Sequence, residues 1–277
     1  MRTIDVSAVT QGVKELFIKA NYHLPEDVYG RLCRARDGEC EEPAATMLGI
    51  ICDNAEAAKN GVPICQDTGM AVVFAEVGQD VHLIGGSFRE AVNEGVRLAY
   101  QEGCLRKSVV SDPLLRVNSE DNTPAVLYTE LVPGDKIRLF ALPKGFGSEN
   151  MSRIRMFNPT ASREEIISFI TETVKISGGN PCPPLVIGIG IGGTFDYSAV
   201  LAKKALLRTV GEHHPVHGDL EEAILSAVNQ SGVGVQGLGK GVTALWASVE
   251  TYATHIAGLP VAVNISCHAT RHADITI

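Results

Sequence analysis

The chain has 277 residues, a hydrophobic content of 45% and a formal net charge of −8, which allows a substantial buried core and excludes an intrinsically disordered protein. Because Lys and Arg are not clustered in this acidic sequence, we expect no nucleic-acid partner. No stretch of about 18 apolar residues occurs and the N-terminus lacks the pattern of a secretory signal, so we expect a cytoplasmic protein that does not span a membrane.

The first part of the chain is predicted to be helical. Residues 1–60 carry apolar side chains at helical spacing, as at Val13, Leu16 and Phe17, and should form a helical layer. After them, residues 70–77 have the β-branched and aromatic content of a strand. A second strand is expected at VHLIGG, and a further helix over residues 87–102.

The middle of the chain alternates strands with glycine-rich turns. The segments AVLYTELV and DKIRLFAL, separated by Pro133 and Gly134, predict a strand pair joined by a turn. The glycine-rich loop KGFGSEN follows directly. A capped helix is expected over residues 160–177, and PCPPLVIGIGIGGT then predicts a buried strand that ends in another glycine-rich turn.

The last part of the chain predicts helices over residues 196–208 and 218–229 and a strand at LPVAVNIS. No repeat or flexible linker separates these elements from the earlier ones. The sequence therefore predicts one compact domain over residues 1–277. Its expected class is α/β, of the mixed α+β kind, with a helical N-terminal layer and a mixed sheet flanked by helices.

The seven cysteines fall into two groups. In a reducing compartment they are expected to be core residues or metal ligands and not disulfides. We expect buried apolar thiols within helices at Cys33, Cys52 and Cys104, and an exposed thiol at Cys40. The remaining three lie in turn-forming contexts where strands end: Cys65 in PICQDTG, Cys182 in GGNPCPP and Cys267 in NISCHATR.

The spacing of Cys65, Cys182 and Cys267 disfavours the common metal sites. Structural zinc sites and electron-transfer ferredoxins use closely spaced cysteine pairs, which this chain lacks. If the three thiolates bind one cubane cluster, its fourth iron has no protein ligand and can act as a Lewis acid, which favours hydration chemistry. From spacing alone, three unrelated buried thiols remain the alternative.

Three further motifs are interpreted as structural. His213, His214 and His217 lie in a loop containing Pro and Gly and are assigned to the surface. The G-x-G-x-x-G pattern that begins at Gly188 lacks the acidic residue of a dinucleotide site and predicts tight packing instead. GVGVQGLGKG lacks the Ser or Thr that ends a phosphate-binding loop.

Together, several segments resemble the α subunit of the two-subunit class I iron–sulfur fumarases and the closely related α subunit of L-tartrate dehydratase. The resemblance runs nearly end to end. The segments that carry it are PICQDTG, LRKSVVSDPL, PKGFGSEN, NPCPPLVIGIGIGGT, LAKKALLR and HIAGLPVAVNISCHATR.

The resemblance implies a set of functional residues. The ligands of a 4Fe-4S cluster with one open iron would be Cys65, Cys182 and Cys267. The substrate would be contacted by Gln66, Asp67, Arg106 and the backbone at Gly147, and the catalytic residues would be Asp67 and His255. Arg106 suits a carboxylate because a guanidinium can form two parallel charge-assisted bonds, and Asp67 could be a general base or orient one. His255 would be expected near a helix end.

The resemblance also implies a partner and a reaction. Because the chain stops ten residues after Cys267, a separate β subunit is expected, in a complex of two α and two β chains. The expected reaction is the reversible conversion of L-malate into fumarate and water. Two alternatives remain open, namely dehydration of L-tartrate to oxaloacetate and a non-catalytic subunit that carries a cluster or zinc. In CHATRH, His272 stands where relatives often have a second basic residue.

Overall fold

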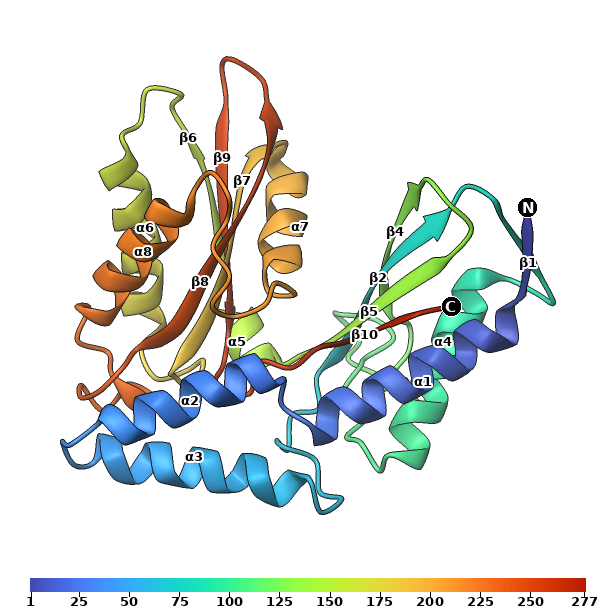
Figure 1. Ribbon diagram of the computed structural model, residues 1–277, viewed down its shortest axis with the longest axis horizontal. Coiled ribbons are helices and arrows are strands. Elements are labelled where there is room, and N and C mark those ends of the chain that lie inside the picture. Colours follow the sequence, from blue (N-terminus) through green and yellow to red (C-terminus); the bar gives the residue numbers. More distant parts are fainter. The chain divides into compact units, whose positions relative to one another are not determined.

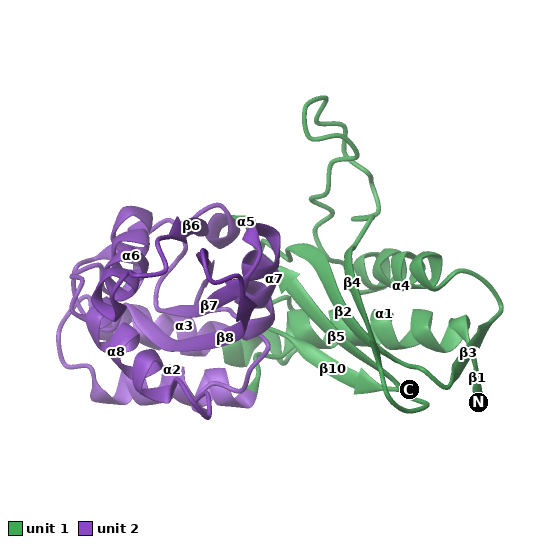
Figure 2. Ribbon diagram, turned by 90° about the horizontal axis from the view of Figure 1, so that it is seen from above, with its two compact units in different colours: residues 1–25, 55–146, 271–277 green, residues 26–54, 147–270 purple.

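The computed structural model describes all residues, 1–277, and divides them into two compact units (Figure 2). Unit 1 contains Met1–Pro25, Ala55–Phe146 and Arg271–Ile277, and unit 2 contains Glu26–Asn54 and Gly147–Thr270. Each unit has its own hydrophobic core. The units are therefore discontinuous in sequence.

Unit 1 is built on a four-stranded sheet with the strand order β10-β5-β2-β4. The strands are β2 (Met70–Gly78), β4 (Val126–Val132), β5 (Ile137–Lys144) and β10 (Ala273–Thr276). The central strand β2 runs parallel to β4 and antiparallel to β5. Two short strands, β1 (Arg2–Asp5) and β3 (Val81–Ile84), form a separate parallel pair.

Two helices supply most of the remaining core of unit 1 (Figure 1). They are α1 (Val6–Tyr22) and α4 (Phe88–Glu102), and each begins at a side-chain cap, Asp5 or Ser87. A Cβ placed on Gly95 of α4 would lie 2.6 Å from the carbonyl oxygen of Thr10 in α1. The two helices therefore pack at a distance that only glycine permits.

The predicted pairing of the two strands around Pro133 and Gly134 is wrong. Both strands exist, as β4 and β5, but β2 lies between them and is hydrogen-bonded to each. Gly134 adopts a φ of +111°, and its carbonyl oxygen accepts a hydrogen bond from the backbone of Asp80, which follows β2. The connection therefore passes across the end of β2, which is the most apolar of the three strands and takes the central position.

Unit 2 contains a second four-stranded sheet with the order β6-β9-β7-β8. Its strands are β6 (Arg153–Phe157), β7 (Leu185–Gly193), β8 (Ala244–Thr254) and β9 (Leu259–Ser266). The helical elements that begin or lie in this unit are α2 (Glu26–Gly38), α3 (Ala44–Ala58), α6 (Arg163–Ser177), α7 (Phe195–Ala205), α8 (Gly218–Asn229) and the 3-10 turn at Val235–Gly237. A single turn of helix, α5 (Phe146–Glu149), occupies the predicted glycine-rich loop.

The glycine-rich strand β7 has two different faces. Ile187 and Ile189 belong to the core that contains α6 and α8. Gly188 and Gly190 face α7, and a Cβ on either would lie 2.0 Å from a carbonyl oxygen of that helix. Figure 1 shows α7 on one side of this sheet and α6 with α8 on the other. The glycine spacing therefore serves helix packing, as predicted.

Most predicted elements and the mixed α/β class are confirmed. The helices expected in residues 1–60 are present, but α1 belongs to unit 1 and α2 to unit 2. Cys104 is exposed and follows the end of α4, so its assignment as a buried helical thiol is wrong. Four strands were not anticipated, namely β1, β6, β8 and β10. No helix has the length and apolarity needed to span a membrane.

Candidate functional site

The segment PICQDTG lies immediately before β2 in unit 1. Cys65 and Asp67 are half-buried, Gln66 is exposed, and the Cys65 thiol lies 3.5 Å from Oε1 of Gln66. Thr68 and Gly69 are buried, and Gly69 has a φ of +80°. The segment thus presents three candidate side chains from a turn whose second half is buried.

Both carboxylate oxygens of Asp67 accept backbone hydrogen bonds. Oδ1 accepts from the N–H of Gly69 at 3.0 Å, and Oδ2 accepts from the N–H of Phe146 at 3.0 Å. A Cβ on Gly145 would lie 3.1 Å from Oδ2, so this position needs a very small residue. The carboxylate therefore has a defined orientation, and the KGF segment is one of the elements that define it.

Arg106 lies next to the Asp67 turn. Its side chain is exposed, and its backbone carbonyl accepts a hydrogen bond at 3.0 Å from Oγ1 of Thr68. Unit 1 thus brings together Gln66, Asp67 and Arg106, a carboxylate and a guanidinium from segments about 40 positions apart. A guanidinium can bind an anionic group and a carboxylate can accept a proton, so the two neighbouring segments carry both kinds of group.

Cys182 and Cys267 occupy neighbouring loops of unit 2. Strands β7 and β9 are antiparallel, with Val186 opposite Ser266, so the loop before β7 and the loop after β9 leave the sheet at the same end. The backbone N–H of His268 donates to the carbonyl of Cys182 at 3.3 Å. Cys182 is exposed, with a φ of +55°, a conformation that non-glycine residues rarely adopt outside functional or tightly constrained sites.

Gly147 lies beside the Cys182 loop. A Cβ on Gly147 would be 3.5 Å from the carbonyl oxygen of Asn180. The same helical turn is held by Glu149, whose carboxylate pairs with Lys203 of α7 and accepts from Nδ2 of Asn264 at 2.9 Å. Unit 2 therefore brings together Gly147, Cys182 and Cys267.

His255 does not join this group. It lies in the exposed turn between β8 and β9, not near a helix end as predicted, and its Nδ1 accepts a hydrogen bond from the backbone of Ala257 at 3.1 Å. Cys267 follows the opposite end of β9, and eight strand residues span about 26 Å. Within unit 2, His255 is thus remote from both cysteines.

The three cysteines have the chemistry of cluster ligands. None of the seven cysteines forms a disulfide, and Cys65, Cys182 and Cys267 are each at least partly accessible in loops. No group of three or more His, Cys, Asp or Glu side chains is arranged to hold a metal ion within either unit. Two of these accessible thiols lie on adjacent loops of unit 2 and the third lies in unit 1.

Sequence reasoning missed three buried residues behind the Asp67 turn. The guanidinium of Arg271 is buried and donates from Nη2 to the carbonyl of Asp67. The hydroxyl of Tyr100 lies 2.8 Å from the carbonyls of Thr68 and Gly69, and burial raises the pKa of Tyr100. The third residue, Asn122, also contacts Gly69. These residues carry no local motif, because their partners are distant in sequence.

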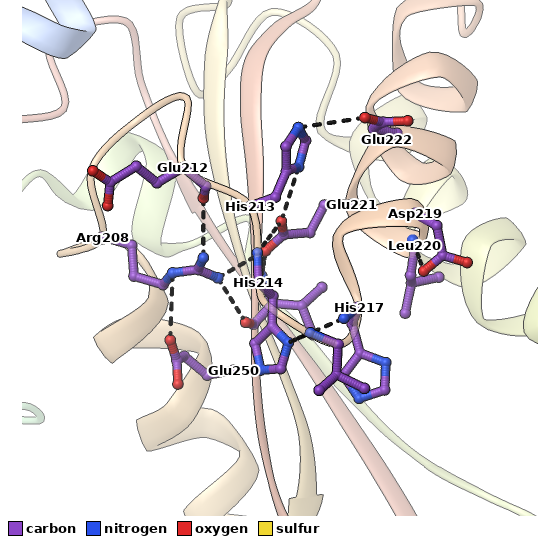
Figure 3. A network of polar contacts seen from close by, with 12 residues as sticks. Arg208, Glu212, His213, His214, His217, Asp219, Leu220, Glu221, Glu222 and Glu250 are labelled. Carbon is purple, nitrogen blue, oxygen red and sulfur yellow. Dashed lines mark hydrogen bonds and ion pairs between the residues drawn. The ribbon is translucent and has the colours of Figure 1, made fainter.

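The histidines at 213, 214 and 217 belong to a hydrogen-bond network (Figure 3). Nδ1 of His213 lies 3.3 Å from the carboxylate of Glu221, which is buried and is paired with Arg208 at 2.8 Å. Nδ1 of His214 accepts from the backbone N–H groups of Val216 and His217, each at 3.1 Å. Their contacts shape the loop between α7 and α8.

Comparison with known proteins identifies the family. The sequence profile described as fumarate hydratase (Fumerase) matches residues 10–276. The chain belongs to the fumarate hydratase family. This is a hydro-lyase family, and the match includes both groups of candidate site residues.

Individual relatives of this fumarate hydratase family member align with it over nearly the full length of both chains. A Methanocaldococcus jannaschii protein, provisionally named L(+)-tartrate dehydratase subunit alpha, is 41% identical over 96% of each chain. Proteins named L(+)-tartrate dehydratase subunit alpha from Escherichia coli K12 and Shigella sonnei are each 28% identical, over 98% of this chain and 93% of theirs. The family model is thus named for fumarate, whereas these relatives are named for L(+)-tartrate.

Proposed function

We propose that this chain is the α subunit of an iron–sulfur hydro-lyase that interconverts L-malate with fumarate and water. The observation that carries the proposal is the fixed carboxylate of Asp67 on a turn that is hydrogen-bonded to the backbone of Arg106, whose side chain is exposed, in a chain of the fumarate hydratase family. A dicarboxylate needs a cation for binding, and its dehydration needs a base for the carbon-bound proton. Both groups are supplied by unit 1.

The proposed cofactor is a 4Fe-4S cluster held by Cys65, Cys182 and Cys267. Thiolates are the ligands that such clusters use, and these three cysteines are all accessible in loops. When bound through three thiolates only, the cluster would supply an open iron that activates a substrate oxygen as a Lewis acid.

The protein residues have separate roles in the proposed reaction. Arg106 binds one substrate carboxylate through parallel N–H···O bonds, with Gln66 and the backbone at Gly147 as further contacts. An oxygen of Asp67 accepts the proton from the carbon next to a carboxylate. The C–H electron pair becomes the new C=C bond and the hydroxyl leaves with the C–O electron pair. The leaving hydroxide takes a proton from solvent to form water, and Asp67 then releases its proton to solvent, so no net proton is gained or lost. Hydration of fumarate is the reverse.

The role of His255 rests on the family resemblance alone. Its position at the far end of β9 from Cys267 separates it from the proposed ligands in unit 2. We therefore assign proton transfer within this chain to Asp67.

A separate β subunit is the proposed partner, in a complex of two α and two β chains. Several relatives carry the name subunit alpha, which presupposes at least one further subunit in those proteins. The β chain is expected to contribute further groups that bind the substrate, so the isolated α chain should bind a cluster but have little activity.

L-tartrate is the second candidate substrate. The 41% identical relative and the more distant bacterial relatives are all named for tartrate dehydration. Tartrate differs from malate by one hydroxyl group, and its dehydration would give oxaloacetate through the enol. The same Asp67 and Arg106 chemistry serves both substrates.

The proposal is tested by reconstituting the chain with iron and sulfide under nitrogen, alone and with the candidate β polypeptide. Fumarate absorbance is followed after addition of L-malate, and oxaloacetate formation after addition of L-tartrate. Fumarate formation that requires both chains, and is lost in Cys65→Ser, supports the proposal. Oxaloacetate formation with malate inert would change the substrate to tartrate. A fully loaded complex that is inert toward both acids, with a cluster spectrum unaffected by either, would instead indicate a non-catalytic subunit.

A further inference from the structure

Asn122 connects the two segments that carry Asp67 and Arg106. It is fully buried and has a φ of +65°, a left-handed conformation that Asn tolerates better than most residues. Its Oδ1 accepts hydrogen bonds from the backbone N–H groups of Ser108 at 2.8 Å and Val109 at 3.2 Å. Its Nδ2 donates to the carbonyl of Gly69 at 3.2 Å.

The Asn122 side chain therefore contacts both the segment that follows Arg106 and the turn that contains Asp67. Ser108 lies two residues after Arg106, and Gly69 lies two residues after Asp67. The same Gly69 donates its N–H to Oδ1 of Asp67, so the orientation of the catalytic carboxylate depends on where the Gly69 peptide is held. A second link, from Thr68 to the carbonyl of Arg106, runs parallel to that through Asn122.

The polar contacts of Asn122 are costly to replace. A buried N–H or C=O group without a hydrogen-bond partner costs about 1–3 kcal/mol. Because the Asn122 side chain makes three hydrogen bonds to backbone groups, moving it away from them would be costly. The neighbouring Tyr100 also contacts both segments, because its hydroxyl donates to the Gly69 carbonyl at 2.8 Å and its carbonyl accepts from the N–H of Leu105, next to Arg106, at 3.0 Å. The amide of Asn122 thus connects the two segments alongside Thr68 and Tyr100, and its two ends contact different partners.

We propose that Asn122 is a positioning residue that holds the Asp67 turn and the Arg106 segment in register for substrate binding and proton transfer. This inference rests on the proposed function. Because its two ends serve different segments, different substitutions should affect substrate binding and turnover separately.

Two variants separate the two ends of the amide. Asn122→Asp keeps the acceptors for Ser108 and Val109 but replaces the donor to Gly69 with an oxygen, so the Asp67 turn should shift while Arg106 stays in place. Asn122→Gly accommodates the positive φ and removes all three bonds. The matched control is Asn93→Asp, which keeps the hydrogen bond that the Asn93 side chain accepts from Ala125 N–H at 2.9 Å.

The measurement is steady-state kinetics of the reconstituted two-chain complex, with iron and sulfide content and thermal unfolding determined for each variant. Since a displacement of about 1 Å can cost about 100-fold in rate, Asn122→Asp should lower kcat about 100-fold with KM changed by less than about threefold. Asn122→Gly should lower kcat similarly and raise KM about tenfold, because Arg106 is then released as well. Cluster content should match that of the wild type and of Asn93→Asp.

Several outcomes would overturn the inference. A wild-type kcat in either Asn122 variant would do so, and so would loss of activity that simply follows loss of cluster or of folded protein in both variants. An inactive wild-type complex would be a different failure, because it would overturn the proposed function and the inference with it.

Discussion

At the scale of single residues, the carboxylate of Asp67 is the group to which we assign proton transfer in the proposed reaction. It is oriented by two backbone N–H groups that come from different parts of unit 1. An amide at this position keeps the size of the side chain but is a far weaker base. Asp67→Asn should therefore lower kcat by at least about 100-fold, the range in which general-base catalysis contributes.

The measurement for Asp67→Asn is turnover of L-malate and L-tartrate by the reconstituted complex, with cluster content as a second readout. Asp80→Asn, at an exposed position of the same unit, is the control and should behave as the wild type. Retention of a tenth or more of kcat in Asp67→Asn would exclude this carboxylate as the base.

A second residue with a large expected effect is Glu221, which has no role in the proposed chemistry. Its side chain is 1% exposed and accepts from Arg208 and from the backbone of His214 and Val249, each at 2.8 Å (Figure 3). Glu221→Ala leaves the N–H groups of His214 and Val249 without their acceptor, whereas Arg208 keeps Glu250 and two backbone carbonyls, and the change should destabilise the protein by about 2–4 kcal/mol.

Chemical denaturation compares Glu221→Ala with Glu222→Ala, whose side chain is 70% exposed. The exposed pair should contribute less than about 1 kcal/mol. Equal unfolding midpoints for the two variants would show that the buried network contributes nothing to stability.

Sequence patterns predicted residues within local motifs and missed residues that act across the chain. Cys65, Gln66 and Asp67 share one segment, and Arg106 lies in a second recognisable segment. Asn122 and Arg271 contact the same turn from 53 and 204 positions away. No spacing rule connects such partners, because their proximity results from the packing of the sheet and helices around them.

At the scale of elements, the difference between predicted and observed structure has the same origin. A capped helix was predicted over residues 160–177, and α6 is present, but its cap is the Ser162–Glu165 capping box and the helix begins at Arg163. The pairing of β4 with β5 was wrong because the insertion of β2 between them is a non-local event. Local chemistry thus predicted that this helix exists, whereas strand order required the complete unit.

The packing of α7 on β7 gives a prediction at this scale. A Cβ at position 190 would lie 2.0 Å from the carbonyl oxygen of Ser198 and 2.6 Å from the nitrogen of Ala202. Gly190→Ala must therefore displace the helix from the strand and should destabilise the protein by at least about 1–3 kcal/mol. Denaturant unfolding measures the change.

The same substitution at Gly49, in α3, is the control. No atom lies within 4 Å of a Cβ at that position, so alanine should stabilise the helix by about 1 kcal/mol through its higher helix propensity. A Gly190→Ala protein as stable as Gly49→Ala would contradict the close packing of α7.

At the scale of the whole molecule, stability should depend on alkaline pH through a buried thiol. Burial raises the pKa of Cys52 from 9.0 to about 11, so the folded protein keeps this proton after the unfolded chain has lost it. The unfolded state then binds fewer protons, and the free energy of unfolding should fall as pH rises from about 9 to 11.

Denaturant unfolding of the wild type and of Cys52→Ala, at intervals from pH 8 to pH 11, isolates this effect from other groups. The stability of the wild type relative to Cys52→Ala should decrease across this interval. A constant difference would mean that the thiol titrates alike in the folded and unfolded chains.

The discontinuous composition of unit 1 has a consequence for how the protein is made. Residues 55–146 supply β2, β4 and β5, but the strand that pairs with β5 lies beyond residue 272, after all of unit 2 has been translated. Domains generally fold in the order in which they leave the ribosome. All residues of unit 2 are therefore synthesised before unit 1 is complete. Until β10 is synthesised, the edge of β5 that pairs with it has no partner strand. Arg271 and its bond to Asp67 arrive in the same final step, so the candidate catalytic turn matures late in synthesis.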